Sequence, residues 1–223
     1  MIQPAVFDRL DVQESLFKEG SEMNRKKILA LCECAIMIAL AVIFDYLSKF
    51  ISSFFPNPWV NGGGITIAMI PMIFVSYRHG FLWGSITAFV HSLLQIVMGW
   101  YAPPAATLLS FVLCVLLDYV LAFTVLGTAI FFAKLFKNRL LGYGVGAFTV
   151  CMLRFVCSFL SGAILWGEYI TWGFENVWAY SFVYNISYML PNAILTAIIT
   201  VSLCSVFNPV TLKRYPKKEQ GNA

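Results

Sequence analysis

Two charged side chains lie deep inside apolar stretches of the sequence, where they could bind a charged ligand. Asp118 comes ten residues after Leu108, at the start of one apolar run, and Arg154 comes thirteen residues after Leu141, at the start of the next. Each charge costs about 2.5–3.5 kcal/mol at the centre of a membrane helix, so both should face an interior that offers partners. Two interpretations follow: a structural pair between Asp118 and Arg154, or an Asp118 carboxylate that receives a cationic or amino-bearing ligand.

Polar and aromatic side chains occupy the first half of the last apolar run, residues 178–207, whereas the second half is nearly all Ala, Ile, Leu, Thr and Val. Four of them recur at intervals of four residues and so share one side of a helix: Tyr180, Tyr184, Tyr188 and Asn192. Asn185 lies beside this side. Ser181 and Ser187, in the same half, are typical of contacts between membrane helices. The shared side is the part that could line a site.

Tryptophan is distributed unevenly between the two predicted membrane surfaces. A lipid interface favours Trp at both surfaces, yet Trp83 alone lies near one of them, and five others lie at or beyond the opposite helix ends: Trp59, Trp100, Trp166, Trp172 and Trp178. Aromatic rings attract cations by about 0.5–2 kcal/mol when dry, and a carboxylate fixes an amino group or positive centre. The complementary ligand is a flat, nitrogen-rich cation.

The elements that position these residues are six apolar runs. Of the 223 residues, 60% are hydrophobic and 12% charged, and the mean hydropathy is +0.78, which excludes a disordered chain, a disulfide scaffold and an ordinary soluble domain. We predict an all-α membrane protein whose six transmembrane helices form one compact bundle, over residues 28–46, 64–77, 80–98, 108–132, 141–166 and 178–207. The second run is short and contains Pro71, which favours a tilted or broken helix.

Basic residues set the expected orientation, because Lys and Arg near membrane helices stay on the cytoplasmic side. With an inner amino terminus, the outer flanks carry only Lys49, and the inner flanks carry eleven basic residues: Arg25, Lys26, Lys27, Arg78, Lys134, Lys137, Arg139, Lys213, Arg214, Lys217 and Lys218. Both termini are therefore expected in the cytoplasm, and the net charge of +4 requires no nucleic acid. We expect a polar extension or leader over 1–23, a membrane domain over 24–209 and a basic cytoplasmic tail over 210–223.

Motifs for catalysis, metal binding or ATP hydrolysis do not occur in the sequence. It lacks the phosphate-loop pattern G-x-x-x-x-G-K-[ST] and the H-E-x-x-H and G-x-S-x-G patterns. The six cysteines lie inside apolar runs, where free Cys packs as a small hydrophobic residue. Glu33 and Asp45 lie near the ends of the first run, where a solvated or snorkelling role suffices. We expect no enzyme, cofactor or metal, but a capture subunit that takes its energy from elsewhere; the alternatives are a stand-alone facilitator and an intramembrane enzyme acting on a lipid-like substrate.

Several sequence blocks, taken in order, resemble the thiamine-specific S components of energy-coupling factor (ECF) vitamin transporters, the ThiT or YuaJ type. The resemblance covers residues 24–209, and its blocks are GGITIAMIP at 63–71, YRHG at 77–80, LDYVLAF at 117–123, LRF at 153–155, SGA at 161–163 and YSFVYN at 180–185. It implies a multi-pass subunit of the bacterial plasma membrane that captures thiamine from outside.

The resemblance also implies which residues meet the ligand. Four match family positions that contact thiamine, the last of them by stacking: Asp118, Tyr180, Asn185 and Trp166. Three more match positions that line or border the site: Tyr119, Arg154 and, in an outer loop, Tyr101. Trp59 lies near, but not at, a stacking Trp of the first outer loop. Ser158 replaces a His beside the ligand, which points to lower affinity or to a thiamine precursor or analogue.

Partners follow from the same resemblance. S components dock on a transmembrane coupling protein that carries two cytoplasmic ATPases, through an Ala-x-x-x-Ala pattern that Ala35 and Ala39 match. Small residues four apart allow two helices to approach closely. The implied mechanism is toppling of the loaded subunit in the lipid bilayer, driven by ATP hydrolysis on its partners.

Overall fold

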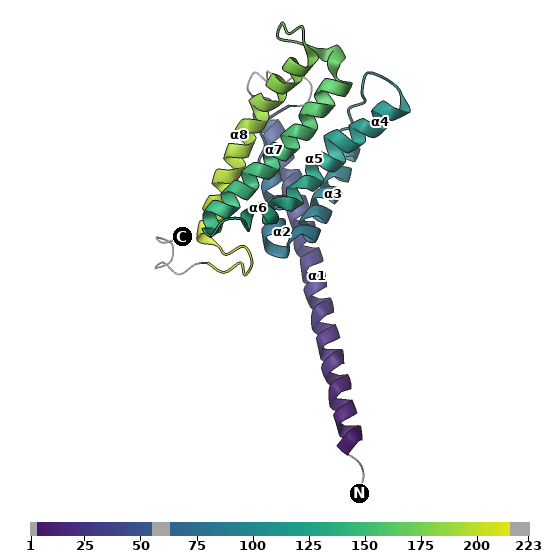
Figure 1. Ribbon diagram of the computed structural model, residues 1–223, viewed down its shortest axis with the longest axis vertical. Coiled ribbons are helices and arrows are strands. Elements are labelled where there is room, and N and C mark those ends of the chain that lie inside the picture. Colours follow the sequence, from purple (N-terminus) through teal and green to yellow (C-terminus); the bar gives the residue numbers. More distant parts are fainter. Residues whose placement is uncertain (1–3, 55–62, 215–223) are drawn as a thin grey trace.

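Helices dominate the part of the chain that the computed structural model describes, residues 4–54 and 63–214, with side chains from residue 20 onward (Figure 1). The α-helices are α1 (Pro4–Ser52), α2 (Met69–His79), α3 (Phe81–Met98), α4 (Leu108–Cys114), α5 (Leu121–Thr124), α6 (Ala129–Ala133), α7 (Arg139–Leu165) and α8 (Val177–Val206). Three short helical segments of other types lie between them: the π-helical η1 (Val115–Val120), which is wider than an α-helix, and the 3₁₀-helical η2 (Val125–Thr128) and η3 (Gly167–Tyr169), which are tighter.

Membrane-spanning length is reached by five helical segments of the described chain. They are Gly20–Ser52, Phe81–Met98, Leu108–Ala133, Arg139–Leu165 and Val177–Val206. The third segment joins α4, η1, α5, η2 and α6 into one path through the bundle. These spans confirm an all-α membrane protein, and α2 is the sixth helix of the predicted bundle although it is too short to cross a bilayer by itself.

The second apolar run forms a helix over only part of its length. Residues 63–67 are irregular, and α2 is eleven residues long. Pro71 lies in the first turn of α2, where proline is tolerated because the backbone N–H groups have no partner within the helix. The helix is nevertheless central, since Met69, Met72 and Ile73 have no exposed surface. The run thus departs from a straight full-length span, as expected, but the departure is an irregular segment before a short continuous helix, and the expected tilt stays a prediction.

Close helix packing depends on small residues. A Cβ atom on Gly142 would lie 2.4 Å from the backbone oxygen of Ala133, so α7 can lie against α6 only with glycine there. The core beside this contact contains Ala129 and Ala147, both without exposed surface. All six cysteines are free, and four of them are buried, as expected for small apolar residues. Packing of small side chains thus brings the spans near enough to enclose a site.

Helix α1 is longer than its apolar run and projects beyond the bundle (Figure 1). It was expected over residues 28–46, but it is continuous from Pro4 to Ser52, and no proline follows Pro4 to break it before residue 28. Where it meets the bundle it packs through small buried residues, Ala30, Cys34 and Ala41. The start of α1 and the end of α8 lie at the same end of the bundle, opposite the loops before α4 and after α7 (Figure 1). The division at residue 23 stays a prediction.

Candidate ligand-binding site

A cavity of about 670 Å³ opens among α1, α3, α7, α8 and the π-helical turn η1. Its wall contains eight of the nine residues predicted for the ligand: Tyr101, Asp118, Tyr119, Arg154, Ser158, Trp166, Tyr180 and Asn185. The ninth, Trp59, lies outside the described residues. Side chains from three of the predicted apolar runs and from the loop before α4 therefore meet in one place, at the end of the bundle predicted to face outward.

Asp118 is presented by the π-helical turn Val115–Val120, an insertion that is frequent at functional sites because it redirects side chains. Its Oδ2 accepts a hydrogen bond from Trp166 Nε1 at 3.1 Å, and Cys114 Sγ lies 3.6 Å from the same oxygen. Asp118 and Arg154 are not an ion pair in the described chain. Of the two interpretations of these charges, the structural pair is wrong, and the Asp118 carboxylate is held at the cavity wall by an indole.

Tyr119 fastens the loop before α4 to the rim of the cavity. Its hydroxyl donates to the backbone oxygen of Gly99 and accepts from the backbone nitrogen of Tyr101, both at 3.3 Å. The ring of Trp100 stacks on Tyr119 with centroids 5.6 Å apart. Tyr119 and Tyr101, predicted from sequence as separate contributors, therefore act on the same part of the rim.

The tyrosine face predicted for the last helix is present on α8. Ring centroids of Tyr180 and Tyr184 are 5.6 Å apart, and those of Tyr184 and Tyr188 are 5.9 Å apart. Trp172, in the loop before α8, packs on Tyr184 with centroids 5.6 Å apart. The three tyrosine rings line the cavity as a continuous aromatic wall, against which Trp172 packs, as expected for a site that takes a flat cation.

Asn185 is fixed by its neighbours on α8. Its Nδ2 donates to the backbone oxygen of Ser181 at 2.9 Å, and its Oδ1 accepts from the Tyr188 hydroxyl at 2.7 Å. Ser181 donates in turn to the backbone oxygen of Phe159 on α7 at 2.7 Å, so its predicted role in joining helices is confirmed. Ser187 instead donates to Tyr184 within α8.

Asn192, the last residue of the tyrosine face, holds the irregular segment before α2. Its Nδ2 donates to the Gly64 oxygen at 2.8 Å, and its Oδ1 accepts from the Thr66 nitrogen at 2.9 Å. One buried side-chain amide thus satisfies two backbone groups as a neighbouring strand would. Sequence spacing placed Asn192 on the correct face, but no local signal connects it with residues 64 and 66.

Asp45 lies in the cavity wall, so the expectation of a solvated helix end is wrong. Its Oδ1 accepts from Thr66 Oγ1 at 3.2 Å, and its Oδ2 accepts from Gln95 and lies 3.3 Å from His91 Nε2. The sequence signals that could have indicated this contact were an acidic residue in one apolar run and an amide, Gln95, in another. The described residues contain no cluster of three His, Cys, Asp or Glu side chains that could hold a metal ion.

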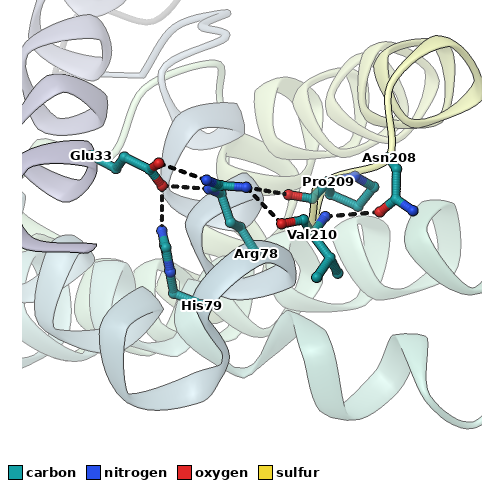
Figure 2. A network of polar contacts seen from close by, with 6 residues as sticks. All are labelled: Glu33, Arg78, His79, Asn208, Pro209 and Val210. Carbon is teal, nitrogen blue, oxygen red and sulfur yellow. Dashed lines mark hydrogen bonds and ion pairs between the residues drawn. The ribbon is translucent and has the colours of Figure 1, made fainter. Parts of the chain in front are cut away.

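A second polar network lies at the other end of the bundle (Figure 2). Glu33 of α1 accepts from Arg78 Nε and, at 2.6 Å, from Arg78 Nη2, and its Oε2 lies 2.5 Å from His79 Nε2. Arg78 Nη1 also donates to the backbone oxygens of Pro209 and Val210, at 3.3 and 2.7 Å. Glu33 was expected to be solvated or to snorkel to the membrane surface; it instead joins α1, the end of α2 and the segment after α8.

The predicted docking residues lie just past this network on α1. Ala35 and Ala39 are both exposed, whereas Cys34 and Ala41 face the bundle. The two alanines are four residues apart and so lie on one side of the helix. That side is available to another helix in the membrane.

Comparison with known proteins agrees with this arrangement. The model of the thiamine transporter protein family (Thia_YuaJ) matches residues 31–212. The thiamine transporter ThiT of Bacillus subtilis (strain 168) is 35% identical over 196 residues, which cover 83% of this chain and 94% of that protein. A solved structure of ThiT from Listeria monocytogenes superposes with a TM-score of 0.62 over 80% of this chain and 94% of that one, at 21% identity, and so shares the fold.

These relatives are named for transport rather than for a catalysed reaction, which agrees with the expectation that the chain is not an enzyme. The membrane-spanning helices of this chain, together with its similarity to a transporter, correspond to a multi-pass protein of the cell membrane. The family match covers most of the chain, including every described residue that lines the cavity from Asp45 to Asn192. The chain belongs to the thiamine transporter family.

Proposed function

We propose that the chain is the substrate-capturing S component of an ECF-type importer and that it binds thiamine in the cavity. The observation that carries this proposal is the meeting of Asp118 with an aromatic wall in one cavity at the end of the bundle. A carboxylate and several aromatic faces suit a flat molecule that carries an amino group and a positive ring. The cavity is large enough for a ligand of that size.

Roles within the site follow from the contacts. Asp118, oriented by Trp166 Nε1, pairs with the amino or cationic part of thiamine. The ring of Trp166 and the tyrosine Tyr180 offer faces for stacking, and Asn185 offers an amide whose orientation Tyr188 fixes. Tyr119 and Tyr101 close the rim. Side chains held in place before the ligand arrives lose little freedom on binding, which favours affinity.

Energy comes from partners in this proposal. Ala35 and Ala39 face away from the bundle, and a coupling protein that carries two cytoplasmic ATPases docks there. Both termini lie in the cytoplasm, so the cavity opens to the outside until docking topples the loaded subunit. The exposed small residues favour this arrangement over a stand-alone facilitator.

Two measurements test the proposal. Purified protein is titrated with thiamine while tryptophan fluorescence is followed, and we expect saturable quenching and no ATP hydrolysis by the chain alone. Uptake of labelled thiamine is then compared in cells that contain or lack the coupling protein and its ATPases. Uptake without these partners would support a facilitator, and absence of thiamine binding would reject the proposed ligand.

A further inference from the structure

Exposed apolar side chains lie beside basic ones on two loops at the end of the bundle opposite the cavity. The first loop, residues 134–138 between α6 and α7, reads KLFKN, and the second, residues 207–214 after α8, reads FNPVTLKR. Both lie outside the membrane-spanning segments, and neither contains an acidic residue. Leu135 is 75% exposed and Val210 is 56% exposed, and Leu212 is exposed as well. Apolar surface gathered in this way indicates contact with a partner or a membrane.

The second loop is a closed turn, which we call the post-α8 turn (residues 207–214). Its two ends pair as an isolated antiparallel bridge. The Asn208 nitrogen donates to the Lys213 oxygen at 3.0 Å, and the Leu212 nitrogen donates to the Asn208 oxygen at 2.8 Å. The Asn208 side chain also accepts from the Val210 nitrogen at 3.0 Å (Figure 2). These bonds fix a turn whose residues 210–214 are all exposed.

The bundle holds this turn from its buried side. Pro209 is buried, and the backbone oxygens of Pro209 and Val210 accept from Arg78 Nη1 at 3.3 and 2.7 Å (Figure 2). Tyr77, the preceding residue of α2, donates from its hydroxyl to the backbone oxygen of Tyr143 on α7 at 2.7 Å. The end of α2 therefore contacts both the post-α8 turn and the beginning of α7, which the first loop precedes. The two loops are held at one end of the bundle by the same element.

Basic side chains accompany the apolar ones on these loops. Five are exposed on the loops or on the first residue of α7: Lys134, Lys137, Arg139, Lys213 and Arg214. The helices that carry them lie side by side, since a Cβ on Gly144 of α7 would lie 2.7 Å from Val201 Cγ2 of α8. Acidic phospholipids give a leaflet a negative surface potential, and each Lys or Arg near it strengthens binding about fivefold. Apolar side chains between such cations suit the boundary between headgroups and acyl chains.

We propose that the two loops form a docking surface for the headgroups of acidic phospholipids. The loops directly adjoin the ends of three spans, Leu108–Ala133, Arg139–Leu165 and Val177–Val206, so the surface of a leaflet lies at their level. The cations pair with the anionic headgroups, while the apolar side chains of the post-α8 turn enter the leaflet boundary. Bound lipid then fixes how deeply this end of the bundle lies in the membrane. The inference goes beyond the proposed function and requires neither thiamine nor a coupling protein.

The test compares two lipids on matched variants. Purified full-length protein in detergent is titrated with phosphatidylglycerol or with the zwitterionic phosphatidylcholine, and the unfolding temperature is followed, because a lipid that binds the folded protein raises it. For the wild type we expect the larger rise with phosphatidylglycerol. Lys213→Gln should weaken phosphatidylglycerol about fivefold. Lys49→Gln is the matched control, since Lys49 is equally exposed but lies alone at the other end of the bundle, and less than about twofold is expected there.

Two further variants separate the shape of the surface from its charge. Leu212 has a φ of 55°, a conformation that Asn tolerates, so Leu212→Asn removes the apolar side chain while retaining every charge and the backbone of the turn. We expect phosphatidylglycerol to weaken about threefold or more. Asn208→Ala retains the charges and the apolar side chains but removes the acceptor for the Val210 nitrogen, and it should give a smaller loss in the same direction.

Each contrary outcome overturns the inference in a different way. Equal stabilisation of the wild type by the two lipids would leave the loops to a protein partner. Equal effects of Lys213→Gln and Lys49→Gln, or wild-type affinity in both Leu212→Asn and Asn208→Ala, would mean diffuse attraction without a defined surface. The unfolding temperature without lipid reports that each variant is folded. A thiamine titration of the same samples tests the proposed function separately, because failure to bind thiamine leaves the lipid result unchanged.

Discussion

The two ends of the bundle use charged side chains in opposite ways. In the network of Figure 2, both carboxylate oxygens of Glu33 and the Nε, Nη1 and Nη2 atoms of Arg78 have protein partners. In the cavity, Arg154 has only an aromatic face beneath it. Charges that satisfy one another stabilise the fold, whereas a charge without an acceptor at a cavity wall is available to a ligand. Burial alone therefore does not identify a binding residue; the state of its partners does.

Helix α1 takes part in both ends. Glu33 belongs to the network and Asp45 to the cavity wall, twelve residues apart, which is about 18 Å along a helix. Small buried residues lie between them, so a continuous rod connects the wall of the cavity to the network. The exposed alanines lie on the other side of this rod. Variants at the two ends should therefore separate ligand binding, stability and docking.

The largest effect is expected from blocking the exposed side of α1. Ala39→Trp places an indole where the coupling helix must approach, so uptake of thiamine in cells with the complete transporter should be lost while thiamine affinity of the purified protein is unchanged. Ile198→Trp on α8 is a matched control, because Ile198 is also exposed but lies outside the proposed docking face. Loss of binding in Ala39→Trp would mean that the position supports the bundle instead.

The next effect concerns the network. Arg78→Ala leaves the partly buried Glu33 carboxylate without its main partner and frees the segment after α8. Removal of one member of such a pair lowers the free energy of unfolding by about 3 kcal/mol. Unfolding in detergent measures this loss. Distant sites are nearly independent, so thiamine affinity should change by less than about twofold. Arg78→Lys keeps one ion pair and should be intermediate; a large loss of affinity in either variant would show that the ends are coupled.

The sequence is sufficient to predict features that depend on local periodicity. Apolar runs locate the spans, Pro71 marks the short second helix, and four-residue spacing identifies the tyrosine face of α8. Such features are predictable because a helix alone determines which side chains share a face. Asp118 could be predicted as a cavity residue because a charge inside an apolar run has to face the interior of the bundle.

Features that depend on contacts between distant residues are not predictable in this way. Glu33 and Arg78 are 45 residues apart, and Asn192 and Thr66 are 126 apart, so no local pattern reports either contact. Asp45 had the same signal as Asp118, an acid in an apolar run, but its place near a helix end suggested water as its partner. The packing of α3 and residues 63–66 against α1 supplies other partners.

A smaller effect is expected at the carboxylate of the cavity. Asp118→Asn keeps the shape but removes the charge that pairs with the ligand, and should weaken thiamine binding about ten- to a hundredfold, or about 1.5–3 kcal/mol. Stability should be nearly unchanged, because Asp118 and Arg154 do not form an ion pair in the described chain. Titration and thermal unfolding of the same preparation measure both. An unstable variant that Arg154→Gln rescues would return Asp118 to a structural role.

The smallest effect is expected at Asn192, which holds part of the cavity wall in position and is not proposed to pair with the charge of the ligand. Asn192→Leu keeps the volume of the side chain without adding a charge, but it removes both the donor to the Gly64 oxygen and the acceptor for the Thr66 nitrogen, so residues 63–66 should be held less firmly. A typical hydrogen bond contributes about 1 kcal/mol, which corresponds to roughly fivefold weaker thiamine binding. A less firmly held wall retains the bound ligand less well but does not change how the ligand reaches the cavity. We therefore expect a faster dissociation rate of thiamine in stopped-flow fluorescence and a nearly unchanged association rate. Thr196→Val, one turn further along α8 and outside the cavity wall, is the matched control. Equal effects of the two variants would mean that general packing of α8, and not the amide of Asn192, sets the lifetime of the complex.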